Sequence, residues 1–228
     1  MAESITYVAI WAQLLPIAAL LLLPRPIARE FVLTGLVLSI SLAVDGAMMW
    51  LGSRGINTLW LIHAGLPVMT ALILWSLSYF QLRLVPRDAL RIAAGLYAVV
   101  WLVMTAAVED VTQFSRFTAP LQALVVIAAA AYTLLSRLRH SSVPATTPWF
   151  WISIAWLLYF GSGAVLDPVS DMMLEVNAID HLRGVFYVKA GIDIIAFGLL
   201  TLGVLCGRSS LRFGGSISPP PAPLRSSS

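Results

Sequence analysis

The chain has 228 residues, of which 59% are hydrophobic and 11% are charged, with a mean hydropathy of +0.88. Soluble domains carry about 25% charged residues, so this composition excludes an ordinary soluble domain and indicates an integral membrane protein. The net charge of +3 does not indicate nucleic-acid binding, because the arginines lie between apolar stretches, and the single cysteine excludes an internal disulfide or a cysteine metal cluster.

Seven apolar stretches approach the roughly 20 residues that a membrane-spanning helix needs. In chain order they are Ile5–Leu23, Phe31–Leu51, Thr58–Phe80, Ala89–Val108, Phe117–Leu138, Trp149–Leu166 and Leu182–Cys206. The first contains Gln13 and Pro16, although proline is tolerated in membrane helices. Because the N-terminal residues lack the basic region and the cleavage site of a secretory signal, we expect this helix to be retained.

Two connecting segments have distinctive composition. The longest predicted connection is Asp167–Asp180, in which residues 172–174 would form a short interfacial helix. The segment after Arg208 is rich in Gly, Pro and Ser, and cannot bury enough apolar surface to fold. The predicted organisation is therefore a transmembrane domain over residues 1–208 and a disordered cytoplasmic tail over residues 209–228.

The charges of the loops differ between the two sides of the predicted bundle. One side holds Arg25, Arg29, Arg83, Arg87, Arg91, Arg137, Arg139, Arg208, Arg212 and Arg225. The other side holds Arg54, Arg116 and Arg183 together with six carboxylates. Cytoplasmic loops carry an excess of Lys and Arg, so the N-terminus is expected outside and the C-terminus inside. This requires an odd number of spans and predicts an all-α seven-helix bundle in the bacterial inner membrane.

Lys189 is the only lysine, and it lies within the last apolar stretch, with Asp193 four residues later. Ionisable residues inside a membrane are costly and are commonly functional. Asp45 and His63 fall at a similar depth, about 6–12 Å below the outer boundary at 1.5 Å per residue. If their helices are neighbours, Lys189 is expected to pair with Asp193, Asp45 or both.

Further polar residues, including Gln122 and Tyr159, lie in the same outer half of the bundle. The sequence therefore predicts a polar pocket that opens outward, with no catalytic residue and no metal ligand assigned. The ligand-binding residues predicted are Lys189, Asp193, Asp45, His63, Gln122 and Tyr159. Other interpretations are a self-neutralising Lys189–Asp193 pair, a hydrogen-bonded packing role for His63, and helix packing by Tyr159 and Ser162.

Two runs on the sixth stretch are similar to a known family. Pro148-Trp149-Phe150-Trp151-Ile152 and Tyr159-Phe160-Gly161-Ser162-Gly163 resemble the penultimate helix of a family of bacterial seven-helix membrane proteins without an established function. The similarity extends over the last three helices. It implies a seven-helix membrane fold and assigns no functional residue.

A second resemblance is to the microbial rhodopsins, which share seven helices, an outside N-terminus and a lysine in the last helix. It implies a Schiff base between Lys189 and retinal. The chain departs from that plan, because Val185 stands four residues before the lysine, where a carboxylate is expected. The third stretch also contains no acid.

Hydrolase classes fit the sequence poorly. Membrane zinc hydrolases need several intramembrane histidines, and His63 alone is suitably placed. A rhomboid-type protease needs a serine in a Gly-x-Ser-Gly motif and a histidine base, but the run around Ser162 lacks the first glycine. We therefore expect a non-enzymatic protein that binds a small ligand, an ion or a lipid headgroup, with no cofactor identified.

Other functions remain open from the sequence. The main alternative is an accessory or structural subunit of a larger membrane complex, with another membrane protein as its partner. A proton-coupled transporter and a retinal-binding protein are further alternatives. The expected partners are thus the lipid bilayer, a membrane protein or a small ligand.

Overall fold

The computed structural model describes residues 8–140, 143–175 and 179–213, and over this part the chain is helical, with no strand. The elements are α2 (Leu14–Leu21), α3 (Arg29–Gly52), α4 (Leu59–Tyr79), α5 (Leu84–Ala107), α6 (Thr118–Leu138), the 3-10 helix η1 (Pro144–Thr146), α7 (Pro148–Glu175) and α8 (Ile179–Phe213). Long apolar runs favour helices because a helix satisfies its backbone hydrogen bonds internally.

Within the described ranges, six helices are long and apolar enough to cross a membrane. They are Arg29–Gly52, Leu59–Tyr79, Leu84–Ala107, Thr118–Leu138, Pro148–Ser170 and Leu182–Arg208. The prediction of an all-helical chain with multiple apolar helices is confirmed. The bounds of the second to fifth predicted stretches agree with α3 to α6 to within a few residues.

The first predicted stretch, Ile5–Leu23, is a shorter apolar helix over its described part, Val8–Leu21. At 1.5 Å per residue this part covers about 21 Å, less than the ~30 Å hydrocarbon core of a bilayer. The helix is interrupted at Gln13, whose N–H donates to Ile10 O over 3.3 Å. Pro16 has no N–H for the preceding turn, which accounts for the irregularity.

The prediction of a long outer connection over Asp167–Asp180 is wrong. Helix α7 continues through Pro168 to Glu175, so residues 172–174 belong to a long helix and form no separate interfacial one. A proline removes one backbone hydrogen bond, and such a loss is tolerated within apolar helices. Helix α8 also runs to Phe213, into the first residues of the predicted tail, and residues 214–228 lie outside the described part.

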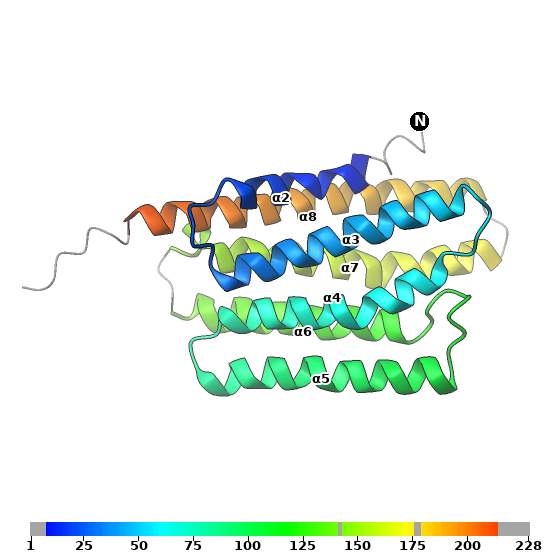
Figure 1. Ribbon diagram of the computed structural model, residues 1–228, viewed down its shortest axis with the longest axis horizontal. Helices are drawn as coiled ribbons and strands as arrows, with labels where there is room; N and C mark the ends of the chain where they lie inside the picture. The colour runs from blue at the N-terminus through cyan, green and yellow to red at the C-terminus, as the bar shows by residue number, and fades with distance from the viewer. Residues whose placement is uncertain (1–7, 141–142, 176–178, 214–228) are drawn as a thin grey trace, which may run out of the picture.

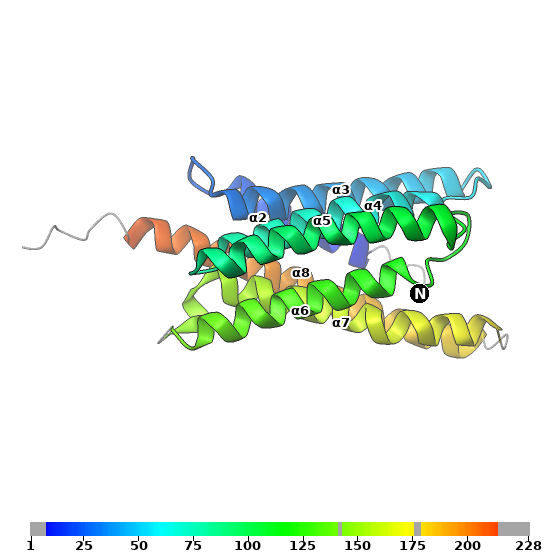
Figure 2. The same cartoon turned by 90° about the horizontal axis from the view of Figure 1, so that it is seen from below.

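The helices form two layers, seen edge-on in Figure 2. One layer holds α3, α4 and α5, and the other holds α6, α7 and α8. Chain neighbours pack together within each layer, α7 with α8 most extensively, while α4 packs on α6 across the layers and α2 covers α8 and α3. Helix α5 lies at one edge of the bundle (Figure 1), against α4 and a little of α6.

The loops that join the helices lie at two opposite ends of the bundle. The first, which we call the arginine-rich end, holds residues 22–28, 80–83, 139–140 and 143–147 at the left of Figure 1. The second, which we call the acidic end, holds residues 53–58 and 108–117 at the right. The grouping of loops is the one expected from their charges.

Small residues bring helices close together at the arginine-rich end. A methyl group on Gly203 would lie 2.7 Å from Ile152 Cγ1 and 3.3 Å from the Ile152 backbone nitrogen. A methyl group on Gly207 would lie 2.3 Å from Cζ of the buried Phe31 ring. Close approach through glycine is the usual way in which apolar helices pack. Towards the acidic end, a methyl group on Gly184 or Gly191 would meet no atom within 4 Å.

Buried hydroxyl and amide groups also link the helices nearer the arginine-rich end. Thr34 of α3 and Ser76 of α4 are fully buried, and their hydroxyl oxygens lie 3.0 Å apart. Gln81 Nε2 donates to Thr133 Oγ1 of α6 over 2.7 Å. These bonds and the glycine contacts hold the helices together at this end of the bundle.

Candidate functional site

Lys189 of α8 forms an ion pair with Asp167 of α7. Its Nζ lies 3.5 Å from Asp167 Oδ1, and the lysine side chain is 25% exposed. Asp167 comes within reach because α7 extends beyond Pro168 and carries the carboxylate on a helix. The sequence placed Asp167 in a loop and named Asp193 or Asp45 as the partner. The observed ion pair is therefore with a residue that the prediction left out.

Gly163 and Tyr159 shape the surroundings of this ion pair. A methyl group on Gly163 would lie 3.2 Å from Asp167 Oδ2 and 3.5 Å from Lys189 Nζ, so the glycine makes room for both groups. The Tyr159 ring centroid lies 5.8 Å from Lys189 Nζ, a cation–π distance. Tyr159 packs in turn on Phe197 of α8, with ring centroids 5.6 Å apart. Aromatic rings thus line the side of the ion pair that faces the middle of the bundle.

Asp193 lies one helical turn beyond Lys189 on α8. Its Oδ1 atom is buried and has no hydrogen-bond partner. The carboxylate lies within electrostatic range of Lys189, Asp167 and Asp45. A buried acceptor without a hydrogen-bond donor lowers the stability of the folded state by about 1–3 kcal/mol. The unpaired Oδ1 atom of Asp193 therefore destabilises the fold unless a donor or a cation binds to it.

Asp45 of α3 is bound by a residue that the sequence analysis did not select. Gln13 Nε2 donates to Asp45 Oδ2 over 2.7 Å, and the Gln13 side chain is only 3% exposed. The Oε1 atom of Gln13 is buried without a partner. The available signal was the presence of a polar residue, Gln13, within an otherwise apolar stretch, three residues before Pro16.

The resulting charge cluster, which we call the Lys189 cluster, consists of Gln13, Asp45, Tyr159, Asp167, Lys189 and Asp193. It brings three aspartate side chains and one lysine side chain together. Its two unpaired buried atoms, Gln13 Oε1 and Asp193 Oδ1, are both acceptors. The cluster therefore lacks hydrogen-bond donors, and a donor group or a cation would satisfy these two acceptors. No group of three or more His, Cys, Asp or Glu residues suited to a metal ion occurs in the described part of the chain.

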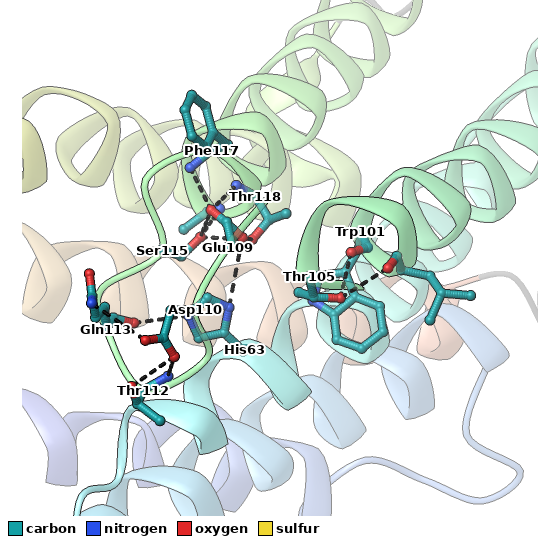
Figure 3. Close-up of polar contacts among 12 residues, drawn as sticks. His63, Trp101, Thr105, Glu109, Asp110, Thr112, Gln113, Ser115, Phe117 and Thr118 are labelled. Atoms are coloured by element: carbon teal, nitrogen blue, oxygen red, sulfur yellow. Dashed lines mark hydrogen bonds and ion pairs between the residues drawn. The ribbon is translucent and has the colours of Figure 1, made fainter. Parts of the chain in front are cut away.

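His63 belongs to a second cluster, under the loop between α5 and α6 at the acidic end (Figure 3). The ring is 2% exposed, and its Nε2 lies 3.0 Å from the Gln113 carbonyl oxygen. A carbonyl can only accept, so Nε2 carries the proton. The Nδ1 atom has no hydrogen-bond partner and lies 3.8 Å from Glu109 Oε2. His63 is thus engaged with this loop, apart from the Lys189 cluster with which the sequence had grouped it.

Glu109 organises the loop and caps helix α6. Its Oε1 accepts from the Phe117 and Thr118 backbone N–H groups over 2.7 and 3.0 Å, and its Oε2 accepts from Thr118 Oγ1 over 2.6 Å (Figure 3). Burial raises the pKa of the Glu109 carboxyl, but hydrogen bonds from Thr118, Phe117 and Ser115 together outweigh it and hold the pKa below its usual range. A carboxylate at a helix N-terminus is also stabilised by the helix dipole. The loop is therefore fixed by an ionised Glu109.

Gln122 of α6 has a structural partner on α4. Its Nε2 donates to the Leu66 carbonyl oxygen over 3.2 Å, next to Pro67, which lies inside α4. Thr70 Oγ1 donates to the same oxygen over 2.7 Å. Side chains of neighbouring helices commonly satisfy backbone groups near such prolines. Of the six predicted site residues, four therefore lie in the Lys189 cluster, while His63 and Gln122 bind other parts of the bundle.

Comparison of the chain with protein-family models, with curated proteins and with solved structures found no match.

Proposed function

We propose that the chain is a multi-pass protein of the bacterial inner membrane with seven membrane segments, the shortest formed by residues around Val8–Leu21. In this placement the arginine-rich end faces the cytoplasm and the acidic end faces outward. The excess of arginine in the loops at one end supports this orientation through the positive-inside rule. The six long apolar helices support the membrane location.

In that setting the Lys189 cluster is a binding site for a small ligand that carries positive charge or donates hydrogen bonds, and the protein is not an enzyme. The observation that carries this proposal is the pair of buried, unpaired acceptors, Gln13 Oε1 and Asp193 Oδ1, in a cluster that contains three aspartate side chains. Unpaired buried charge is expensive in an apolar environment. A bound cation would remove that cost, so ligand binding and stability are coupled.

Access from the outer side is the direction best supported by the packing. Glycine contacts at Gly203 and Gly207 close the arginine-rich end, and Tyr159 and Phe197 stack between that end and the cluster. Asp167 has a side chain that is 64% exposed, so the cluster reaches the surface of the bundle through α7. A ligand would therefore enter beside Asp167.

The test is a thermal-unfolding titration of the purified protein in mild detergent. The two probe cations are sodium and ethylammonium, each added as the chloride. N-methyl-glucamine chloride replaces the probe salt as the reference, so that the ionic strength stays constant. We expect one of these cations to raise the unfolding temperature in a saturable way, because a ligand that binds only the folded state stabilises it. The Asp193→Asn variant should lose the response. The proposal fails if neither cation has a saturable effect, or if Asp193→Asn responds like the parent.

A pair of glycine variants provides a matched control. Gly163→Ala places a methyl group against Asp167 and Lys189. A methyl group on Gly161, two residues earlier on the same helix, meets no atom within 4 Å. We expect Gly163→Ala to change the cation response and Gly161→Ala to leave it unchanged. Lys189→Met removes a competing positive charge and should strengthen cation binding. If Lys189→Met, Asp193→Asn and their combination also leave cell fitness at the level of the parent, the cluster has no detectable role.

An accessory subunit is the second candidate, and helix α5 is the observation that favours it. The helix buries only Ala94 and Tyr97, while Ile92, Leu96 and Leu102 are each at least 60% exposed. This candidate predicts that another polypeptide co-purifies in mild detergent and that cross-links from α5 capture it. Cross-links to lipid alone, with the protein isolated as a single species, would reject it.

A further inference from the structure

Three arginines from two helices converge on Tyr79 at the arginine-rich end. Arg29 at the start of α3 lies within electrostatic range of the Tyr79 phenol. The Cζ atoms of Arg87 and Arg91, in the first turns of α5, lie 5.0 and 5.4 Å from the Tyr79 ring centroid. The starts of α3 and α5 and the end of α4 meet at this end of the bundle (Figure 1). We call Arg29, Arg87, Arg91 and Tyr79 the Tyr79 cluster.

Negative charge near the Tyr79 cluster is scarce. Asp88 Oδ1 lies 3.9 Å from an Arg91 guanidinium nitrogen, but the Asp88 side chain is 62% exposed, and such exposed pairs contribute little. Glu30, next to Arg29, is the other nearby acid along the chain. Arg25 and Arg83 add further positive charge on the adjoining segments. Guanidinium groups gathered in this way repel one another unless an anion lies between or beside them.

One of these arginines also lacks a hydrogen-bond acceptor. The Nε atom of Arg87 is buried and has no partner, whereas Nε of Arg91 donates to Ser78 Oγ over 3.3 Å. A buried N–H of a charged group without an acceptor is costly. An acceptor beside Arg87 Nε would remove this cost, and an anionic acceptor would also offset the positive charge of the surrounding guanidinium groups.

The chemistry of the cluster matches a phosphate. Arginine presents a planar fork of donors that suits phosphate oxygens, and the N-termini of α3 and α5 add positive potential at the same place. Trp75, 44% exposed and 5.6 Å from Arg91 Cζ, supplies the aromatic side chain typical of the membrane interface. Basic pockets between helices at the cytoplasmic surface are suited to anionic lipid headgroups.

We propose that the Tyr79 cluster binds the phosphate of an anionic phospholipid. The site is separate from the Lys189 cluster, at the opposite end of the bundle, and it rests only on the membrane location of the chain. The lipid phosphate would accept from Arg87 Nε and neutralise the guanidinium groups of Arg87 and Arg91. The lipid chains would lie along the apolar outer surface of α5.

The experiment measures the affinity of the full chain for phosphatidylglycerol in mild detergent by native mass spectrometry and by thermal unfolding. Phosphatidylcholine and inorganic phosphate serve as the comparison ligands. We expect phosphatidylglycerol to bind and stabilise the parent more than either of them. The double variant Arg87→Gln with Arg91→Gln should weaken binding about thirtyfold, from the contribution expected of two arginines near a charged membrane surface. The control is Arg54→Gln at the acidic end, where Arg54 Cζ lies 3.9 Å from the Trp50 ring, and it should bind like the parent.

A second variant keeps the positive charge but removes the planar set of N–H donors of the guanidinium group. Arg87→Lys loses the Nε donor, so it should bind phosphatidylglycerol more weakly than the parent although the net charge is unchanged. Equal binding by Arg87→Lys and the parent would overturn the proposal, because it would show that charge alone attracts the lipid. Equal loss in Arg54→Gln, or equal stabilisation by inorganic phosphate, would overturn it as well.

Discussion

Glu109 provides a quantitative test of the loop that covers His63. Replacing it with alanine removes the acceptor of two backbone N–H groups at the start of α6 and of the Thr118 hydroxyl. Replacing it with glutamine keeps one acceptor oxygen in a side chain of the same size but removes the charge. The two variants therefore separate the hydrogen-bonding role of the carboxylate from its charge.

The magnitudes follow from the buried position of the side chain, which is 4% exposed. Loss of a helix N-cap costs about 0.5–2 kcal/mol, and a hydrogen bond to a charged group contributes about 1.5–3 kcal/mol. These contributions overlap, because the Ser115 and Thr118 hydroxyls already lie 2.7 Å apart and can bond each other. We expect a loss of about 3 kcal/mol for Glu109→Ala and about 1–2 kcal/mol for Glu109→Gln.

The assay is thermal unfolding of the purified protein in mild detergent. For a chain of this size 1 kcal/mol corresponds to roughly 2–4 °C, so Glu109→Ala should lower the unfolding temperature by about 6–12 °C. Asp110→Asn is the control, because Asp110 lies in the same loop, is exposed, and bonds Thr112 and Gln113. It should unfold close to the parent. An unfolding temperature for Glu109→Ala that matches the control would refute the capping role.

Three further predictions concern stability. The pKa of the Glu109 carboxyl is depressed in the folded state, so the carboxylate contributes its full stabilisation above the ordinary pKa of 4.5 and loses it as the pH falls through the lower pKa of the folded state. Lowering the pH should therefore destabilise the parent more than Glu109→Gln. Parallel curves of unfolding temperature against pH for the two proteins would contradict this. Gly207→Ala forces a methyl group against the buried Phe31 ring and should cost about 1–3 kcal/mol, whereas Gly198→Ala, which meets no atom within 4 Å, should be neutral or stabilising in the same unfolding assay. Gln13→Leu deprives Asp45 of its hydrogen-bond donor and should destabilise the protein by about 0.5–2 kcal/mol. Gln113→Leu at the acidic end is the comparison variant. An unchanged unfolding temperature for Gln13→Leu would show that the hydrogen bond to Asp45 does not stabilise the protein.

The helices and the distribution of charge could be predicted from the sequence. Long apolar runs define α3 to α6 to within a few residues, because a chain in an apolar environment must satisfy its backbone hydrogen bonds within each helix. The loops with many arginines also lie together at one end of the bundle. At Asp167-Pro168 the predicted end of the sixth stretch was wrong, because local sequence does not reveal whether packing will carry a helix through a proline.

The partners of the polar side chains were decided by the tertiary structure. Helical periodicity places Lys189 and Asp193 on one face, but it does not say which helix lies opposite, and the ion pair forms with Asp167 of α7. Depth alone grouped His63 with Lys189, whereas packing set His63 beneath the loop that carries Glu109. Gln13, which the sequence suggested only as an irregularity, became the donor to Asp45 because the first helix packs against both α3 and α8. The sequence by itself thus determined most of the apolar helices and the charges of the segments that connect them, while helix packing decided which polar groups meet.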